Sequence, residues 1–305
     1  MKRVIFLLWI LLLLFGNSIT IGIAQSGRNS GNTSDAPAQL SVIVHNKTTE
    51  QINLNKDNLA LFDGGIQQEI EYFRYDSTGA RVIILVDNSQ TLRTDPSLLQ
   101  EIAQAVIAEL KPEDRVMLIG YSEQAEVFSE FTNDIKSLTN ATMQFRKEGS
   151  PKLYDALVAS AGDGFRKQIG ASKRAIVLIS DGYDKSSRIK YEEALSFLLN
   201  ENIVVYAFQS PDRSYGAIRP KDTGPKPIDA ITSLAESTGG ILFKIDKPET
   251  MAANAKTLMT ELKENWFTLA YTPKGINLVN TRRLLLTTPS DKLTVRTKKL
   301  HPPQL

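Results

Sequence analysis

The chain has 305 residues, of which 42% are hydrophobic and 23% are charged, as in an ordinary globular protein. Its 36 basic and 34 acidic residues nearly balance, and no run of Lys and Arg is longer than a pair, so the sequence lacks the basic surface of a nucleic-acid-binding protein. There is no cysteine, which excludes disulfides, thiol catalysis and zinc–thiolate sites. The two histidines, His45 and His301, lie far from the middle of the chain, which argues against a histidine-based triad or metal site there.

The first residues have the pattern of a secretory signal. Lys2 and Arg3 precede an apolar run over residues 4–15, and a small-residue stretch ends at Ala24. We predict a signal peptide over residues 1–24 and a secreted or periplasmic mature protein with no membrane attachment. The alternative is an N-terminal membrane anchor, but polar residues between 17 and 20 interrupt the apolar run, and a bilayer span needs about 20 residues. Loss of Lys2 and Arg3 would leave 34 basic and 34 acidic residues (36 less 2, against 34).

Two segments of different character follow. Residues 25–38 are polar and rich in Gly and Ser, which predicts a flexible linker. Residues 39–78 contain short strand patterns near 40–45, 52–54, 59–62 and 67–73, the last after the turn at Asp63-Gly64-Gly65. Because this N-terminal β segment is too short for a core of its own, we expect it to pair with another part of the chain.

Strands and helices alternate over residues 79–264. The apolar strand patterns are 82–86, 115–121, 174–180, 203–209 and 241–245, and the helical patterns are 96–110, 134–146, 151–167, 188–200, 227–238 and 248–263. This alternation predicts an α/β domain with a doubly wound, mostly parallel sheet and helices on both faces, as in Rossmann-like folds. Residues 127–131 suit an antiparallel edge strand, and the long loop 210–227 is expected to be surface decoration.

The C-terminal segment, residues 265–305, returns to strand patterning. We predict that it packs with the N-terminal β segment as one small β unit beside the α/β domain. Trp266 and Tyr271 are expected to pack between that unit and the domain.

Oxygen-bearing side chains follow two of the predicted buried strands. The strand 82–86 runs into Asp87, Ser89 and Thr91, and the strand 174–180 runs into Asp181. In parallel sheets, ligands bind outside the carboxyl ends of the strands, so neighbouring strands would bring both carboxylates into one crevice. Carboxylate and hydroxyl oxygens suit a hard cation such as Mg²⁺.

These residues resemble the metal-ion-dependent adhesion site (MIDAS) of the von Willebrand factor type A (VWA) domain. That site uses Asp-x-Ser-x-Ser after the first strand, a Thr in a later loop and an Asp in a Ser-Asp-Gly turn. Asp87, Ser89 and Thr91 match the first element, with Thr in place of the last Ser, and Asp181 matches the third.

Three further sequence segments narrow the resemblance to one group of VWA proteins. The stretch 54–73, Leu153-Tyr154-Asp155-Ala156 and the stretch 270–273 are similar to bacterial, acidobacterial-type VWFA-related proteins, over about residues 39–298. The resemblance implies an exported, non-enzymatic module that recognises a protein ligand. A carboxylate of that ligand would complete the coordination of Mg²⁺ or Mn²⁺ at a MIDAS-like site.

One ligand position departs from the family pattern. Relatives carry Gly-Gly-Thr before Leu-Tyr-Asp-Ala, and here Pro151, which has no side-chain oxygen, aligns with that Thr. Ser150 could supply the hydroxyl if the loop shifts, which gives Asp87, Ser89, Thr91, Asp181 and Ser150 as the candidate metal ligands. Alternatively, Ser150 is a helix N-cap and Pro151 the first helical residue.

Two other functions stay open. The first is a metal-independent structural or scaffolding VWA domain with a degenerate MIDAS. The second is a Mg²⁺-dependent hydrolase, which is disfavoured because a phosphatase signature places a second acid where Ser89 stands and because no phosphate-cradling Gly loop is present.

Overall fold

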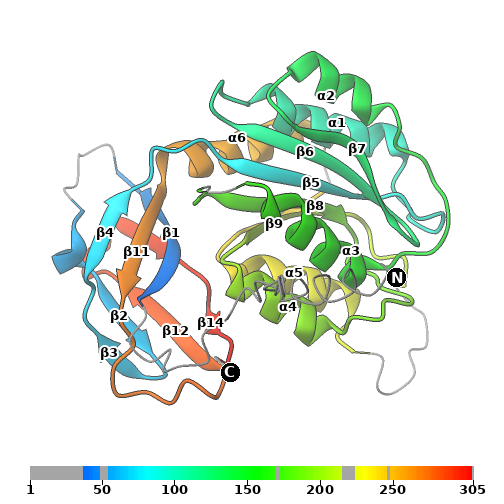
Figure 1. Cartoon of the computed structure of the whole chain (residues 1–305). Coiled ribbons are helices and arrows are strands. Elements are labelled where there is room, and N and C mark those ends of the chain that lie inside the picture. Colours follow the sequence, from blue (N-terminus) through cyan, green and yellow to red (C-terminus); the bar gives the residue numbers. More distant parts are fainter. Residues whose placement is uncertain are drawn as a thin grey trace, which may run out of the picture. The chain divides into compact units, whose positions relative to one another are not determined.

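The structure is a computed structural model, and it describes residues 37–48, 54–168, 170, 172–214, 224–245 and 248–303 (Figure 1). The predicted signal peptide, most of the predicted linker and part of the 210–227 loop lie outside these residues, as does most of the strand predicted at 52–54. Within the described part of the chain, no helix has the length and apolar character needed to cross a bilayer.

A six-stranded sheet forms the centre of the α/β part, in the order β10-β9-β8-β5-β6-β7. All neighbouring strands are parallel except β6 and β7, which form the predicted antiparallel edge hairpin. Continuous aliphatic runs make β5, β6 and β8, because these strands are buried on both faces of the sheet. The strand bounds are β5 Arg81–Asp87, β6 Arg115–Tyr121, β7 Ala125–Thr132, β8 Arg174–Ser180, β9 Val204–Gln209 and β10 Leu242–Lys244.

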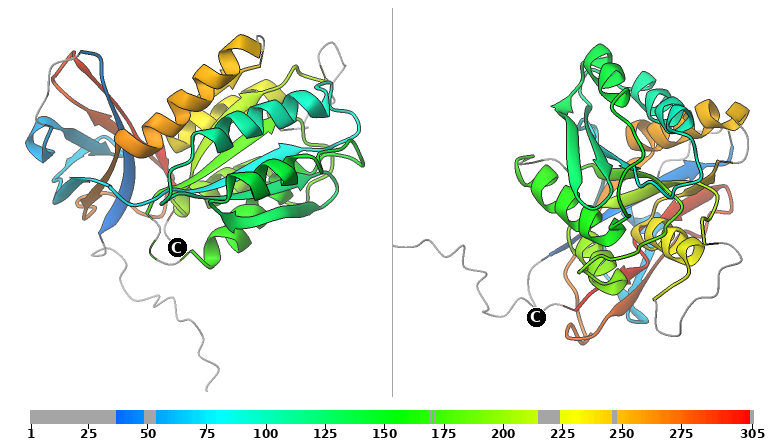
Figure 2. Two further views of the ribbon diagram at one scale, coloured as in Figure 1. Left: turned by 90° about the horizontal axis from the view of Figure 1, so that it is seen from above. Right: turned by 90° about the vertical axis from the view of Figure 1, so that its right-hand side faces the viewer.

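Helices cover both faces of this sheet, which confirms the predicted doubly wound architecture (Figures 1 and 2). One face packs against α1, α2 and α6, and the other packs against α3, α4 and α5. Alternate residues of β5 point to the two cores: Ile84 joins the first and Leu85 the second. The helix bounds are α1 Pro96–Ala108, α2 Ile135–Thr142, α3 Leu153–Ala159, α4 Tyr191–Asn200, α5 Pro227–Thr238 and α6 Met251–Glu264; a π-helical turn, η3, covers Ser160–Gly164.

The N-terminal and C-terminal segments interleave in a β-sandwich, as predicted. One sheet has the order β13-β1-β11-β4 and the other β14-β12-β2-β3, and each mixes strands from both ends of the chain. Leu40 and Leu269 from the first sheet meet Leu61 and Leu284 from the second in a shared core. The bounds are β1 Ala38–Asn46, β2 Ala60–Asp63, β3 Ile66–Gln68, β4 Tyr72–Tyr75, β11 Trp266–Tyr271, β12 Arg282–Thr287, β13 Leu293–Arg296 and β14 Leu300–His301; short 3₁₀ turns are η2 Lys56–Asn58 and η4 Pro248–Thr250.

A buried carboxylate ties the sandwich to the α/β part. Glu261 of α6 is fully buried and accepts hydrogen bonds from His45 at 2.6 Å, Arg296 at 2.6 Å and Tyr206 at 2.8 Å. Burial opposes ionisation of Glu261, but these bonds outweigh it and lower the pKa of the carboxyl group. Trp266, the first residue of β11, belongs to the α/β core. Strand β11 therefore contributes to the α/β core through Trp266 and to the sandwich core through Leu269.

Candidate functional site

Strands β5 and β8 are direct neighbours, with Val86 opposite Ile179 near their carboxyl ends. Asp87 ends β5, and Asp181 immediately follows β8. Both side chains are fully buried. The carboxyl edge of the sheet therefore holds two buried carboxylates side by side, as the strand pattern predicts.

A tight turn after β5 orients the first carboxylate. Oδ1 of Asp87 accepts the backbone N–H of Ser89 at 2.8 Å and the Ser89 hydroxyl at 2.5 Å. The amide of Asn88 donates to the Tyr121 carbonyl of β6 at 2.8 Å, which anchors the turn to the neighbouring strand. These bonds direct the Ser89 hydroxyl and Oδ2 of Asp87 into the crevice.

A second turn positions Asp181. Gly182 has φ of +80°, a conformation that glycine adopts without strain, and its amide donates to the Ser180 hydroxyl at 3.0 Å. The Tyr183 amide donates to Oδ1 of Asp181 at 3.0 Å. A Cβ at Gly182 would lie 2.2 Å from the Pro227 carbonyl oxygen, so the turn also needs glycine for the close approach of α5.

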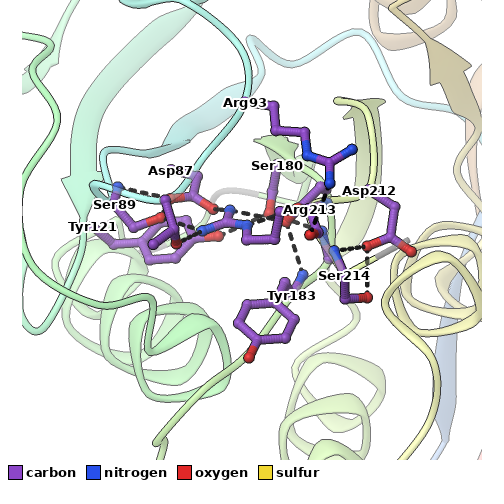
Figure 3. Close-up of polar contacts among 12 residues, drawn as sticks. Asp87, Ser89, Arg93, Tyr121, Ser180, Tyr183, Asp212, Arg213 and Ser214 are labelled. Carbon is purple, nitrogen blue, oxygen red and sulfur yellow. Dashed lines mark hydrogen bonds and ion pairs between the residues drawn. The ribbon is translucent and has the colours of Figure 1, made fainter. Parts of the chain in front are cut away.

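The side chain of Arg213 enters the crevice from the loop between β9 and α5 (Figure 3). Nε donates to Oδ2 of Asp181 at 2.7 Å, and Nη2 donates to Oδ1 of Asp181 at 2.9 Å and to Oδ2 of Asp87. Nη1 donates to the hydroxyls of Ser89 at 2.5 Å and Thr91 at 2.9 Å. A guanidinium has five N–H donors, and all five are therefore used within this site.

Further contacts hold Arg213 in place. Its own amide donates to Oδ2 of Asp181 at 3.0 Å, and its carbonyl accepts from Nη2 of Arg93 at 3.3 Å. The guanidinium carbon lies 5.4 Å from the centre of the Tyr183 ring, within range of a cation–π interaction. The side chain of Arg213 is only 5% exposed. Arg213 is therefore a buried, fully bonded residue rather than a surface cation.

Charge explains why a cation is needed here. Burial raises the pKa of Asp87, and Arg213 and Ser89 oppose that rise. Burial lowers the pKa of Arg213, but its bonds to Asp181 and the charge of Asp87 outweigh burial and raise it. Burial also raises the pKa of Tyr121 well above its usual value, which keeps the phenol neutral. The two carboxylates outnumber the Arg213 guanidinium, and Arg93, which contacts the Arg213 carbonyl, is a second cation next to the crevice.

Comparison with known families identifies the domain that carries this crevice. Residues 82–183 match the family model of the von Willebrand factor type A domain. The chain contains a VWA domain. The matched segment runs from β5 to the turn after β8, so it includes Asp87, Ser89, Thr91 and Asp181 but not Arg213.

Three solved structures are similar to the chain in fold at low sequence identity. A von Willebrand factor type A protein from Catenulispora acidiphila is 11% identical, with 90% of this chain and 75% of that one covered and a TM-score of 0.49. An aerotolerance-related membrane protein from Bacteroides fragilis is 18% identical, with 60% and 98% covered and a TM-score of 0.46. BatB from Bacteroides thetaiotaomicron is 19% identical, with 60% and 97% covered and a TM-score of 0.45. No curated protein gives a significant match.

The structure brings together four of the five predicted ligands. Asp87, Ser89, Thr91 and Asp181 all contact the Arg213 guanidinium, whereas Ser150 forms no hydrogen bond with Arg213 or with either aspartate among the described residues. The alternative prediction, that Ser150 caps a helix starting at Pro151, is wrong. Helix α3 begins at Leu153 with Lys152 as its N-cap residue.

Two backbone bonds explain the later helix start. The Pro151 carbonyl accepts from the Lys185 amide at 3.0 Å, and the Lys152 amide donates to the Ser122 carbonyl at 3.0 Å. The loop is therefore pinned to both flanking turns of the VWA domain before the helix begins. Pro151 is buried there, and it has no side-chain oxygen at the position where the resemblance expects a Thr hydroxyl.

The present donor set does not fit a divalent cation. Both Asp181 oxygens, Oδ2 of Asp87 and the two hydroxyls already accept N–H groups from Arg213. Within the described ranges, no group of three or more His, Cys, Asp or Glu side chains is arranged to hold a metal. A metal could use these oxygen ligands only if Arg213 left the crevice.

Arg213 is the functional residue that sequence reasoning missed. It lies in the loop predicted to be surface decoration, and that prediction is wrong for Arg213, because its side chain turns inward to the buried carboxylates. One signal was available in the sequence. Two buried carboxylates at adjacent strand ends require a counter-charge, and Arg213 follows β9, the strand next to β8.

Proposed function

We propose that the VWA domain is a non-catalytic module that binds a protein partner, and that Arg213 replaces the divalent cation at its MIDAS-like site. VWA domains generally mediate interactions between proteins, which supports the partner class. The observation that carries the proposal is the bonding of Arg213 to all four oxygen-bearing residues that the motif places at the sheet edge. Of the possibilities left open by the sequence, the proposal adopts the metal-independent VWA domain rather than the Mg²⁺ site.

The energetics favour Arg213 over a metal ion in solution. Arg213 is part of the chain, so its effective concentration at the crevice is on the order of millimolar or higher, while a free ion must also displace its bonds. Mg²⁺ further prefers near-octahedral coordination and gives up its water reluctantly. Without a Thr oxygen at position 151, the protein offers such an ion an incomplete set of ligands.

The same bonds argue against hydrolytic chemistry. A general base needs a free lone pair within reach of the proton that it removes. Asp87 and Asp181 instead direct their oxygens to Arg213 and to turn amides. We expect no turnover of a generic phosphoester in the presence of Mg²⁺. Turnover that Asp87→Ala abolishes would refute the non-catalytic assignment.

Export is part of the proposal and rests on the N-terminal pattern of residues 1–24. Expression of the full chain in a bacterial host, followed by fractionation, tests it. A mature protein starting at Gln25 in the periplasm or medium is expected. Retention of the full chain in the membrane would favour the anchor.

Calorimetry tests the metal-free site directly. Mg²⁺ or Mn²⁺ is titrated into the protein lacking residues 1–24, alongside thermal unfolding at millimolar metal. We expect no heat and no thermal shift, because a ligand that binds only the native state would stabilise it by mass action. Thr91→Val is the comparison variant, because it removes one exposed hydroxyl from the candidate ligands. Metal-induced heat in the parent protein that Thr91→Val weakens would reinstate the divalent cation.

A further inference from the structure

We propose that the crevice is an arginine-binding site, which Arg213 fills from within the chain, and that the protein partner is recognised through an arginine side chain that replaces Arg213. The inference rests on the proposed binding role of this site and names the chemistry of its ligand. Its basis is how closely the crevice matches the shape and donors of a guanidinium.

The acceptors are arranged for a planar fork rather than for a point charge. Asp181 receives Nε and Nη2 on its two oxygens, which is the bidentate geometry specific to arginine. Asp87 and the hydroxyls of Ser89 and Thr91 accept the remaining N–H groups of Nη1 and Nη2. A lysine ammonium has three donors on one atom and could not reach these acceptors together.

An aromatic ring adds a second element of selectivity. Tyr183 lies with its ring centre 5.4 Å from the guanidinium carbon of Arg213. Arginine stacks on aromatic faces. Mg²⁺ holds its water molecules tightly, and a ring face that displaced them would offer no oxygen in return. The ring follows directly after the Asp181-Gly182 turn, so the acceptor and the aromatic surface are fixed by the same few residues.

Charge also favours a cationic ligand. Asp87, Asp181 and Arg213 together carry one negative charge when both carboxylates are ionised, and the positive Arg93 lies next to them, donating to the Arg213 carbonyl. Without Arg213 the two carboxylates would outnumber Arg93, and with Arg213 in place the guanidinium has no free N–H to offer a partner carboxylate. The MIDAS manner of recognition, in which a carboxylate completes a metal's coordination, is therefore not available to this crevice.

Arg213 makes access conditional. It stands four residues beyond the end of β9, so displacement of the first residues of the β9–α5 loop is enough to remove it. A partner arginine must compete with a residue of high effective concentration, which keeps the site closed to weak ligands. Contacts between the partner and residues 210–214 would supply the difference.

Small guanidinium compounds test the site without knowledge of the partner. The protein lacking residues 1–24 is compared with Arg213→Ala, using calorimetry and thermal unfolding with methylguanidinium, methylammonium and Mg²⁺ as separate ligands. Arg166→Ala is the matched control, since Arg166 forms an exposed pair with Asp163. Arg213→Gln, which keeps much of the aliphatic stem, provides the same test if the alanine variant does not fold.

We expect methylguanidinium to bind Arg213→Ala with a Kd on the order of 1 mM, as suits so small a ligand, and to restore part of its lost thermal stability. Methylammonium and Mg²⁺ should do neither, and neither the parent nor Arg166→Ala should respond. Binding of Mg²⁺ but not methylguanidinium to Arg213→Ala would overturn the inference, as would an equal response of Arg166→Ala. A response of the parent protein to Mg²⁺ would instead contradict the proposed metal-free function, so the two failures are distinguishable.

Discussion

Replacing Arg213 by methionine should destabilise the protein by far more than the loss of a surface ion pair. Methionine fills similar space and keeps an apolar stem, but it removes all five N–H donors from the crevice. Asp87 and Asp181 would then remain fully buried, next to each other, with no cation between them. The cost comes from these two carboxylates rather than from lost packing.

The burial of the three groups sets the size of the effect. Removing one partner of a buried ion pair costs about 3–5 kcal/mol, whereas an exposed pair contributes about 0.2–1 kcal/mol. The side chain of Arg213 is 5% exposed and those of the aspartates 0%, so the first range applies. At about 2–4 °C per kcal/mol for a protein of this size, the melting temperature should fall by about 6–20 °C.

The loss should depend on pH with a definite sign. Burial already raises the pKa of Asp87, and removal of Arg213 raises it further because an opposing charge is lost. A folded-state pKa above the unfolded value of about 3.9 means that stability is greatest at low pH and falls as pH rises through the folded pKa. Arg213→Met should therefore be less destabilised at pH 5 than at pH 8.

Urea unfolding followed by tryptophan fluorescence measures both effects. In the protein without residues 1–24, Trp266 is the only tryptophan, and it is fully buried. Arg166→Met is the control, because the Arg166–Asp163 pair is 76% and 75% exposed. A loss below about 1 kcal/mol for Arg213→Met, equal at both pH values, would show that the carboxylates do not depend on Arg213.

Three further substitutions test other parts of the structure. Gly182→Ala should lower the free energy of unfolding by about 1–2 kcal/mol because of the left-handed backbone, and by more because the new Cβ would meet α5. Gly170→Ala is the control: with φ of +79° and open space around it, it should show only the backbone cost in thermal unfolding. Glu261→Gln should lose about 1.5–3 kcal/mol at pH 7, because Arg296, whose side chain is 26% exposed, loses its charged partner. Because the pKa of Glu261 is lowered, that difference should shrink as pH falls below about 4 in acid titrations. Lys298→Met should raise stability at pH 7 by up to about 3 kcal/mol, because burial lowers the pKa of Lys298 to about 8; the gain should vanish as pH rises from 8 towards 10.5 in urea unfolding.

Most of the α/β fold follows from the sequence because its strands are buried on both faces. Each of these strands is a continuous aliphatic run bounded by polar residues, so the predicted bounds of β6 and β8 agree with the structure at both ends. Helix ends are less determined. The pattern from 151 to 167 predicts one helix, and residues 153–166 are helical throughout. A π-helical turn over Ser160–Gly164 interrupts the α-helical hydrogen bonding, which a periodicity of apolar residues does not reveal.

In the candidate site, too, residues at strand ends could be predicted and the loop residue could not. Asp87 and Asp181 could be placed together from the sequence, because parallel neighbours deliver their carboxyl ends to one edge. The position of Arg213 depends on the path of a loop, and loop conformation carries no periodic signal. The sequence does indicate an electrostatic requirement. Buried carboxylates at the ends of two strands need a cation nearby, either an ion from solution or a side chain of the protein.

The source of that cation determines what kind of ligand the domain can recognise. A divalent metal brings two positive charges and vacant coordination positions, so it neutralises both aspartates and attracts a carboxylate. Arg213 brings one charge and uses every donor, so it has no N–H left to offer an anion. Under the proposed function, exchange of a metal for a tethered arginine changes the preferred ligand from an anion to a cation, while Asp87, Ser89, Thr91 and Asp181 remain acceptors. A VWA motif that is intact in these four residues can thus specify a cationic partner, and the residue that decides between the two outcomes lies outside the motif.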